Sequence, residues 1–171
     1  VGLTKKTVIG LANSSGNTRF AYDSYRRLIM MYADVVMEKS NGIIVENNQG
    51  VRHALEKYMD QYKAEKKYCN DTDLDAEDLK ILCKKFKNII IKVLGTEFPD
   101  DPKIQLWNAI KAVFSSWNGE RAQHYRKIEN ISDREGTAFN IQSMVFGNMG
   151  IGSATGVAFT RNPSTGDNIF Y

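Results

Sequence analysis

The 171-residue sequence has only two cysteines, three prolines and no long apolar run. Cys69 and Cys83 are too few for a disulfide framework and match no metal-ligand pattern, which favours a reducing compartment. No run approaches the roughly 20 apolar residues that a membrane-spanning helix needs, and residues 1–10 contain no extended apolar stretch typical of a secretory signal. The sequence therefore predicts a globular protein without a membrane partner.

Charge of one sign is also scarce, because 23 basic and 20 acidic residues leave a net charge of +3. That balance argues against a dedicated nucleic-acid binder, which would concentrate its basic residues. The densest basic stretch contains Lys80, Lys84, Lys85, Lys87 and Lys92. We interpret it as a solvated helix face rather than a polyanion site.

Apolar residues at spacings of three and four predict helices over residues 18–37, 49–68, 76–94, 102–117 and 120–128. Asp75 and Asp101 are predicted to cap two of them, and Asn41-Gly42 to end the first. Residues 1–18 are predicted as loop with a turn at 13–17. The predicted apolar faces are Tyr25, Leu28, Ile29, Tyr32, Val35 and Val36; Val51, Leu55, Tyr58, Met59 and Tyr62; Leu79, Leu82, Cys83, Phe86 and Ile90; and Leu106, Trp107, Ile110, Val113, Phe114 and Trp117.

After Gly136 the period changes from helical to two. Residues 139–146 and 156–160 are predicted as strands of a β-hairpin, joined by the glycine-rich loop 147–155. The expected fold class is therefore α+β, with a helical subdomain followed by a β-hairpin.

The loop is the first candidate for chemistry, because glycines let backbone N–H groups approach phosphate oxygens, and Ser153 and Thr155 add hydroxyl groups. It matches neither the Walker motif nor the dinucleotide fingerprint. A long turn that needs positive φ stays open as the alternative.

Other polar residues favour structural roles. His53 and His124 lie on predicted helices without a partner at a telling spacing, and the acids at 71, 73, 75, 100 and 101 suit caps and loops better than a cation site. Trp107 and Trp117 are predicted to be core. Arg26, Arg27 and Arg121 could bind anions, although exposed arginines often have no specific role.

Three stretches resemble the pyruvate, phosphate dikinase family. They are Asn17-Thr-Arg-Phe-Ala-Tyr-Asp-Ser-Tyr-Arg-Arg-Leu28; Leu94-Gly-Thr-Glu-Phe-Pro-Asp-Asp-Pro102 with Gln105-Leu-Trp107 and Ala112-Val-Phe-Ser-Ser-Trp117; and Gly136-Thr-Ala, Met144-Val-Phe-Gly-Asn-Met-Gly150 and Ser153-Ala-Thr-Gly-Val-Ala-Phe-Thr-Arg-Asn-Pro163. The resemblance implies an internal segment of the N-terminal ATP-binding region, of the ATP-grasp type. It implies three parts: residues 1–18 from a preceding ATP-grasp subdomain, a helical subdomain at 19–95, and ATP-grasp helices and hairpin at 96–171.

By this resemblance, the parent enzyme converts ATP, phosphate and pyruvate to AMP, diphosphate and phosphoenolpyruvate through a phosphohistidine on another domain. The strand containing Gln142, Met144 and Val145 would line the adenine pocket. Gly147, Gly150, Gly152 and Thr155 would lie over the phosphates, and Arg121 and Ser164 would face the docked histidine domain. Mg²⁺ would accompany ATP in the parent, but its ligands would lie outside this segment, which should bind no metal tightly.

The resemblance also implies a homodimeric parent inside the cell, most simply in the cytoplasm, with plastid or glycosome as other compartments. Because the family's phosphate-binding cations and magnesium-binding acids would lie outside residues 1–171, we expect this segment to be inactive alone. Two alternatives stay open: a segment of a phosphoenolpyruvate synthase, and a helical interaction module without catalysis.

Overall fold

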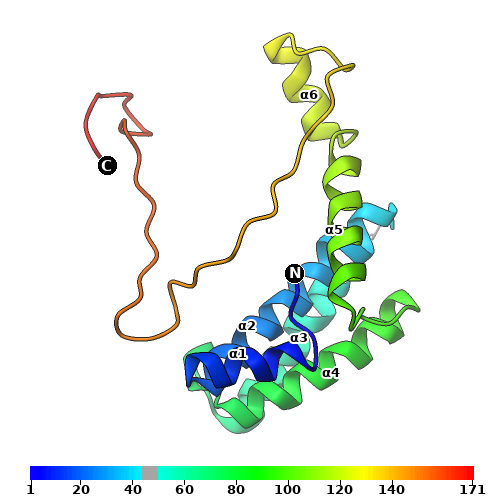
Figure 1. The fold of residues 1–171 in the computed structure, drawn as a ribbon, viewed down its shortest axis with the longest axis vertical. Coiled ribbons are helices and arrows are strands. Elements are labelled where there is room, and N and C mark those ends of the chain that lie inside the picture. Colours follow the sequence, from blue (N-terminus) through cyan, green and yellow to red (C-terminus); the bar gives the residue numbers. More distant parts are fainter. Residues whose placement is uncertain (44–49) are drawn as a thin grey trace. The chain divides into compact units, whose positions relative to one another are not determined.

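A computed structural model describes residues 1–43 and 50–171. They form two compact units, Val1–Ile141 and Gln142–Tyr171, each described here by itself. The first unit is built from helices (Figure 1), and none of the described residues belongs to a strand. The subdomain boundaries expected near residues 18 and 95 stay predictions.

The helices follow the predicted order. They are α1 (Thr7–Ser15), α2 (Thr18–Tyr32), a π-helical turn η1 (Ala33–Glu38), a 3-10 turn η2 (Lys39–Asn41), α3 (Val51–Lys66), a 3-10 turn η4 (Asp71–Asp73), α4 (Ala76–Leu94), α5 (Pro102–Ser116) and α6 (Glu120–Glu129). The predicted start of one helix at Gln49 lies outside the described residues. No described helix is long and apolar enough to cross a membrane.

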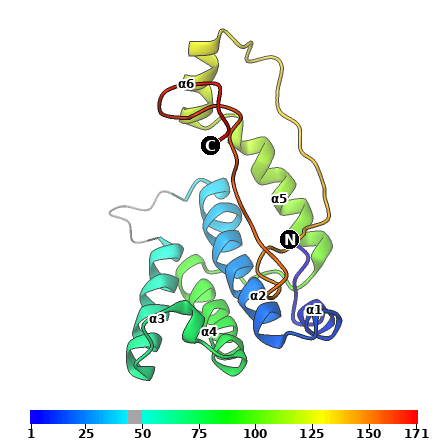
Figure 2. The same cartoon turned by 90° about the vertical axis from the view of Figure 1, so that its left-hand side faces the viewer.

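The core of the first unit lies between α1, α2, α3 and α4. α2 packs most extensively on α4 and next on α1, and α3 packs on α4, so the helices follow the order α3, α4, α2, α1 across the cluster (Figure 2). The predicted face of α4 is confirmed, because Leu79, Leu82, Cys83, Phe86 and Ile90 are all buried. Most of the predicted faces of α2 and α3 are buried as well.

The prediction of loop over residues 1–18 was wrong. Residues 7–15 form α1, which buries Val8 and Ala12 against the core. The serines and asparagine suggested a turn, but only Gly16 adopts the left-handed conformation, with φ of 64°, and it ends the helix there. Glycine tolerates that conformation without a steric penalty. Tertiary packing of two small apolar residues outweighed the local turn preference.

A π-helical turn shifts the face at the end of α2. Val35 was predicted to be core but is 46% exposed, whereas Ala33 and Met37 are buried. Each π-helical hydrogen bond spans one residue more than an α-helical one, so the inward face moves along the sequence. The predicted end of the helical segment at Asn41-Gly42 is confirmed, because Gly42 has a φ of 68°.

Both predicted aspartate caps are confirmed. The Asp75 carboxylate accepts a hydrogen bond from the Asp78 backbone N–H at the start of α4, and the Asp78 side chain returns one to Asp75. The Asp101 carboxylate accepts from the Lys103 and Ile104 N–H groups, with Pro102 at the first position of α5. These bonds satisfy backbone donors that a helix start leaves without a partner.

The apolar pattern of α5 does not mark a buried face in the first unit. Trp107 is 60% exposed and Phe114 is 48% exposed, although the Phe114 ring meets Phe139 edge to face at 5.6 Å. The prediction that both tryptophans are core is therefore wrong for Trp107, while Trp117 is half-buried beneath the Arg126 guanidinium. Periodicity identified the helix correctly but not what covers it.

Gln105 ties α5 to the rest of the first unit. Its side chain is fully buried and accepts a hydrogen bond from the Gly2 N–H at 2.8 Å. It donates to the Leu3 and Pro99 carbonyl oxygens at 2.9 and 2.8 Å. One amide thus joins the first residues of the chain, the 95–101 connector and α5.

Asp100 is a second tie at the same connector. Its carboxylate accepts from Lys87 Nζ at 2.9 Å and Tyr25 Oη at 3.2 Å, and pairs with Lys5 Nζ at 3.0 Å. Lys87 also lies over the Tyr25 and Phe98 rings, so this lysine is not on a solvated face as predicted. Burial alone would raise the pKa of Asp100, but hydrogen bonds from Lys87 and Lys5 lower it to about 2.

We expect Asp100→Asn to lower the free energy of unfolding at pH 7 by about 1 kcal/mol, a value limited by solvent screening of this partly exposed group. The folded-state pKa of Asp100 lies below its ordinary value of 3.8, so the stabilisation is complete above that value. It is lost as the pH falls through about 2. Urea unfolding between pH 2 and 7 should show the two proteins converging at low pH. Asp101→Asn is the matched control and should be near neutral, because asparagine caps a helix as well as aspartate.

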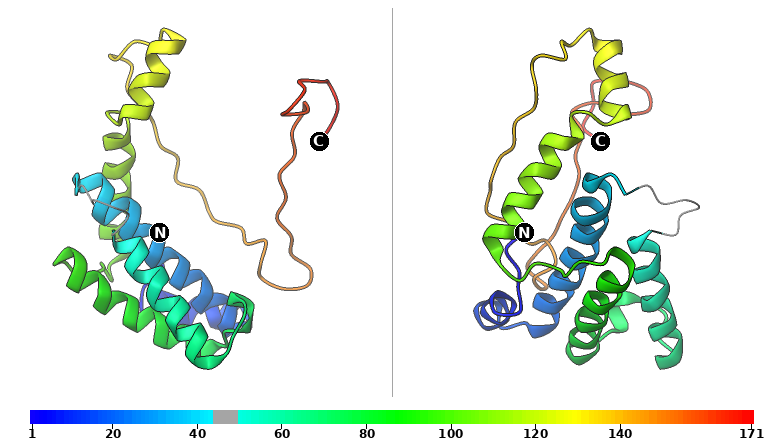
Figure 3. Two further views of the ribbon diagram at one scale, coloured as in Figure 1. Left: turned by 180° about the vertical axis from the view of Figure 1, so that it is seen from behind. Right: turned by 90° about the vertical axis from the view of Figure 1, so that its right-hand side faces the viewer.

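The predicted β-hairpin is absent from the second unit, which corrects the α+β assignment. Residues 139–146 run without a strand partner, and Val145 and Val157 are 92% and 80% exposed. Phe159 instead exchanges backbone hydrogen bonds with Tyr171, at 3.0 and 3.1 Å. Alternation measures fitness for a half-buried pleated surface, and two strands alone are marginal in water. Figure 3 shows this unit as a chain without helices or strands.

Candidate functional site

The loop 147–155 contains the residues predicted to lie over a triphosphate. The Thr155 side chain lies directly on Gly147, where an added Cβ would overlap the Thr155 hydroxyl and come within 2.7 Å of its Cβ. Within the loop, the Ser153 N–H donates to the Gly150 carbonyl at 3.0 Å. The two ends of the loop therefore meet, and glycine at 147 is what permits this contact.

The glycines of this loop do not adopt positive φ. Gly147, Gly150 and Gly152 are absent from the glycines in the left-handed region, which include Gly136 and Gly166 on either side. The alternative of a long turn that needs positive φ is therefore not supported at these three positions. Close approach, at Gly147, is the property that the structure uses.

The residues predicted to line an adenine pocket lie just before the loop. Gln142, Met144 and Val145 are all exposed, Met144 by 71%. Two cavities found among the described residues lie elsewhere, in the first unit. The second unit thus brings Gly147 and Thr155 together but presents the adenine-binding residues open to solvent.

Ser164 lies in a compact turn of the second unit. The Asn162 side-chain oxygen accepts from the Ser164 and Thr165 backbone N–H groups, at 2.8 and 3.2 Å. Arg161 donates to the Gly166 carbonyl at 3.2 Å, across the turn. Ser164 is exposed at its tip. Arg121, the other predicted docking residue, is exposed in the first turn of α6 and belongs to the first unit.

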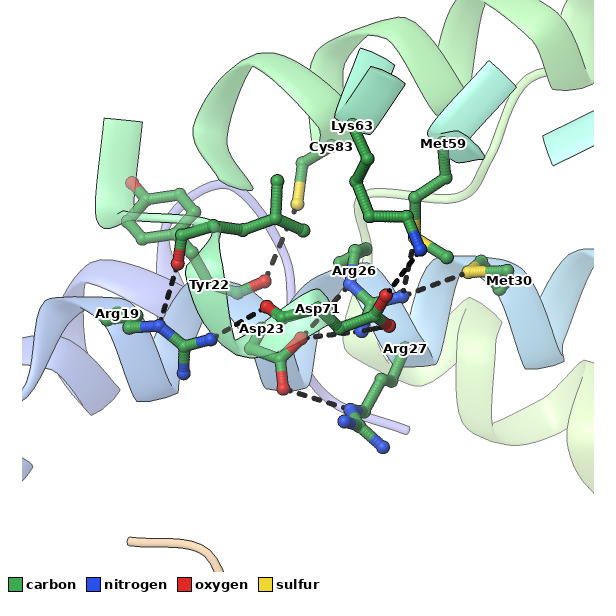
Figure 4. A network of polar contacts seen from close by, with 11 residues as sticks. Arg19, Tyr22, Asp23, Arg26, Arg27, Met30, Met59, Lys63, Asp71 and Cys83 are labelled. Carbon is green, nitrogen blue, oxygen red and sulfur yellow. Dashed lines mark hydrogen bonds and ion pairs between the residues drawn. The ribbon is translucent and has the colours of Figure 1, made fainter. Parts of the chain in front are cut away.

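Arg26 and Arg27, considered above as possible anion ligands, are held within the first unit. Arg26 is buried, and its guanidinium lies 2.6 Å from the Asp23 carboxylate and 3.6 Å from that of Asp71. Figure 4 shows it pointing between these acids and the sulfur atoms of Met30 and Met59. Arg27 pairs with the other Asp23 oxygen at 2.9 Å. These arginines therefore stabilise the fold.

The acids at 71, 73 and 75 have the capping and loop roles that the sequence analysis favoured. Burial alone would raise the pKa of Asp71, but the hydrogen bond from Lys63 and the charge of Arg26 hold it below its ordinary value. Asp73 caps η4 by accepting from the Asn70 N–H. Among the residues that the structure describes, no three such side chains are grouped to hold a metal ion.

A cavity of about 380 Å³ lies between η1 and the start of α3. Two buried acids line it, and both have partners: Asp34 pairs with Lys39 at 2.8 Å, and Glu38 accepts from the Val51 N–H at 2.6 Å. Glu38 thereby caps α3 from outside, because Gly50 supplies no side-chain cap. His53, at the rim, is exposed as expected.

We expect Gly50→Ala to destabilise the chain by about 1–2 kcal/mol, because a Cβ at 50 would lie 2.6 Å from Glu38 Oε1 and push that carboxylate off the α3 N-terminus. Gly10→Ala is the matched control: Gly10 lies inside α1 with nothing within 4 Å of an added Cβ. It should stabilise by up to about 1 kcal/mol through helix propensity. Thermal unfolding of both variants tests the contrast, and equal shifts would contradict it.

Sequence reasoning missed Gln105, Glu38 and Arg126. Arg126 is 5% exposed; it donates to the Trp117 carbonyl at 2.6 Å and to Asp133 at 2.7 Å. A buried polar residue breaks the apolar pattern and so carries no periodic signal. For Arg126, the tryptophan nine positions earlier was the available clue, because arginine stacks on aromatic faces.

Comparison with known proteins places this geometry. A family described as "Pyruvate phosphate dikinase, AMP/ATP-binding domain" matches residues 102–171, which include the loop. Across its whole length the chain is 51% identical to a chloroplastic pyruvate, phosphate dikinase of Flaveria trinervia. It is likewise 51% identical to pyruvate, phosphate dikinase of Clostridium symbiosum, and 47% to that of Rhizobium meliloti. The chain belongs to the pyruvate, phosphate dikinase family. The resemblance seen in the sequence is thus confirmed.

The chain spans only 17–18% of the length of these pyruvate, phosphate dikinases. The similarity covers both units, because all of the chain aligns with the relatives, while the nucleotide-binding match begins at Pro102, the first residue of α5. The helices α1–α4 therefore belong to the same family without forming part of the matched AMP/ATP-binding domain.

Proposed function

We propose that this chain supplies part of the ATP-binding region of an enzyme that converts ATP, phosphate and pyruvate to AMP, diphosphate and phosphoenolpyruvate, with a phosphohistidine on another domain as intermediate. The observation that carries the proposal is the match of residues 102–171 to an AMP/ATP-binding domain that contains the closed loop. Identity near 50% over the whole chain supports the reaction of the named relatives.

In this proposal the loop 147–155 covers the phosphates. Gly147, Gly150 and Gly152 present backbone N–H groups without side chains to obstruct them, and the Thr155 hydroxyl donates to a phosphate oxygen. Gln142, Met144 and Val145 line the adenine pocket. Their exposure is what residues waiting for a ligand and its enclosing elements require.

Arg121 and Ser164 are proposed to contact the phosphohistidine-bearing domain when it docks to accept the phosphoryl group. Both are exposed, one on a helix and one on a tight turn. Mg²⁺ would balance the charge of ATP in such an enzyme. Because the described residues offer no grouped set of ligands for it, no step is assigned to the ion here.

Inorganic phosphate distinguishes the proposed reaction from its nearest alternative. The full-length enzyme should form AMP and phosphoenolpyruvate from ATP and pyruvate only when phosphate is present, with diphosphate appearing in equal amount. Formation of AMP without added phosphate, releasing phosphate instead of diphosphate, would identify a phosphoenolpyruvate synthase. Absence of any ATP- and pyruvate-dependent AMP would favour the helical interaction module.

The isolated 171-residue chain is expected to bind Mg-ATP with a dissociation constant well above micromolar and not to hydrolyse it. The second unit contains one basic side chain, Arg161, which already donates to Gly166, so the triphosphate charge finds no clamp there. Electrostatic clamps supply much of the affinity and rate in phosphoryl transfer. Titration calorimetry tests this, and micromolar binding would contradict it.

Location and assembly are further parts of the proposal. Several relatives are named chloroplastic and others are bacterial, which supports either a plastid or a cytoplasmic enzyme. We further propose that the full-length enzyme is a homodimer. Gel filtration of that enzyme with light scattering tests this assignment.

A further inference from the structure

α6 exposes a continuous stripe that faces away from its anchor. Arg126 fixes the helix by stacking on Trp117, with its guanidinium carbon 4.0 Å from the ring centre, and by bonding the Trp117 carbonyl and Asp133. Arg121, Tyr125 and Ile128 lie at i, i+4 and i+7, and so share one face. At about 100° per residue, that face points well over 90° away from Arg126.

The stripe combines a cation with two large apolar side chains. Tyr125 is 59% exposed and Ile128 is 62% exposed on a helix of only ten residues. Beside them, Arg121, His124 and Lys127 line an open concavity in which Glu120 is the one acid among the described lining residues. Exposed aromatic, aliphatic and arginine side chains on one face are the composition of a protein docking surface.

We propose that the docking contact at Arg121 continues along α6 onto Tyr125 and Ile128. The occupant is the phosphoryl-carrying domain, whose contact surface presents an apolar centre flanked by acidic side chains that pair with Arg121 and Lys127. This inference rests on the proposed function, and it adds two apolar anchors and an electrostatic rim to that site. Spacing of i, i+4 and i+7 is how a helix presents anchors to an apolar groove.

The test uses the full-length enzyme and single-turnover phosphorylation of its histidine by ATP. Ile128→Asp places a negative charge at the centre of the stripe and should slow that step by about 10-fold or more. Nucleotide affinity, melting temperature and the pyruvate half-reaction should not change. Ile128→Leu should behave as wild type. Ile81→Asp, at an exposed isoleucine of α4, is the matched control and should also leave the step unchanged.

Salt dependence tests the rim separately. Lys127→Glu should slow histidine phosphorylation and flatten its dependence on ionic strength, whereas Lys84→Glu, on the exposed face of α4, should do neither. Two outcomes would overturn the inference while the proposed docking stands: Arg121→Glu impairs the step but Ile128→Asp does not, or Ile128→Asp lowers the melting temperature or alters the oligomeric state. If Arg121→Glu itself has no effect, the proposed docking residue fails instead.

Discussion

Arg26→Met is expected to lower the free energy of unfolding of the chain by about 3–5 kcal/mol. The substitution keeps an apolar side chain of similar length in the core but leaves the buried Asp23 carboxylate without its closest partner, now 2.6 Å away. It also removes a cation from Asp71 and a donor from the sulfur atoms of Met30 and Met59. Urea unfolding monitored by tryptophan fluorescence and by circular dichroism measures the loss.

Arg27→Met provides the matched control for this prediction. Arg27 pairs with the same Asp23 carboxylate, but its side chain is 60% exposed, so its loss should cost less than about 1 kcal/mol. Combining Asp23→Asn with Arg26→Met should recover part of the stability, because no buried charge is then left unpaired. Equal effects of the two arginine variants would show that burial does not set the strength of this network.

Thr155→Val is expected to slow phosphorylation of the carrier histidine by ATP about 10-fold or more in the full-length enzyme. Valine keeps the shape that packs against Gly147, so the loop should still close, but the hydroxyl that would bond a phosphate oxygen is gone. Rapid-quench, single-turnover measurement of phosphohistidine isolates this step from the pyruvate half-reaction, which should keep its wild-type rate.

Thr160→Val controls for a general effect of losing a threonine in this unit, because Thr160 is also exposed but lies outside the loop. Its rate should match wild type. A purely structural role for Thr155 would appear as a lower melting temperature with an unchanged rate of histidine phosphorylation, and that result would remove the hydroxyl from the phosphate site.

Elements with a buried face and an explicit cap were predictable from the sequence. α4 is the clearest case, since Asp75 marks its start, Gly95 its end, and its apolar residues are inside. Sequence reasoning failed where packing overrode local preference, as at α1, and where a π-helical turn moved the inward face away from Val35. It also failed at Trp107, whose periodic position indicates a buried face that the first unit does not cover.

The predicted strands failed for a related reason. Alternation at 139–146 shows which residues suit a sheet but not where partner strands come from, and the described chain gives these residues none. The candidate site residues came from a resemblance rather than from a pattern, and their roles stay predictions. The contact between Thr155 and Gly147 joins residues eight positions apart, and no sequence rule used above predicted it.

Photolabelling of the full-length enzyme with 8-azido-ATP, followed by peptide mapping, tests most directly whether this chain forms part of an ATP site. The account predicts covalent label within the peptide that contains Gln142, Met144 and Val145, with excess ATP suppressing it. Label that appears only outside residues 142–155, or that excess ATP does not reduce, would contradict the proposed nucleotide-binding role of this chain.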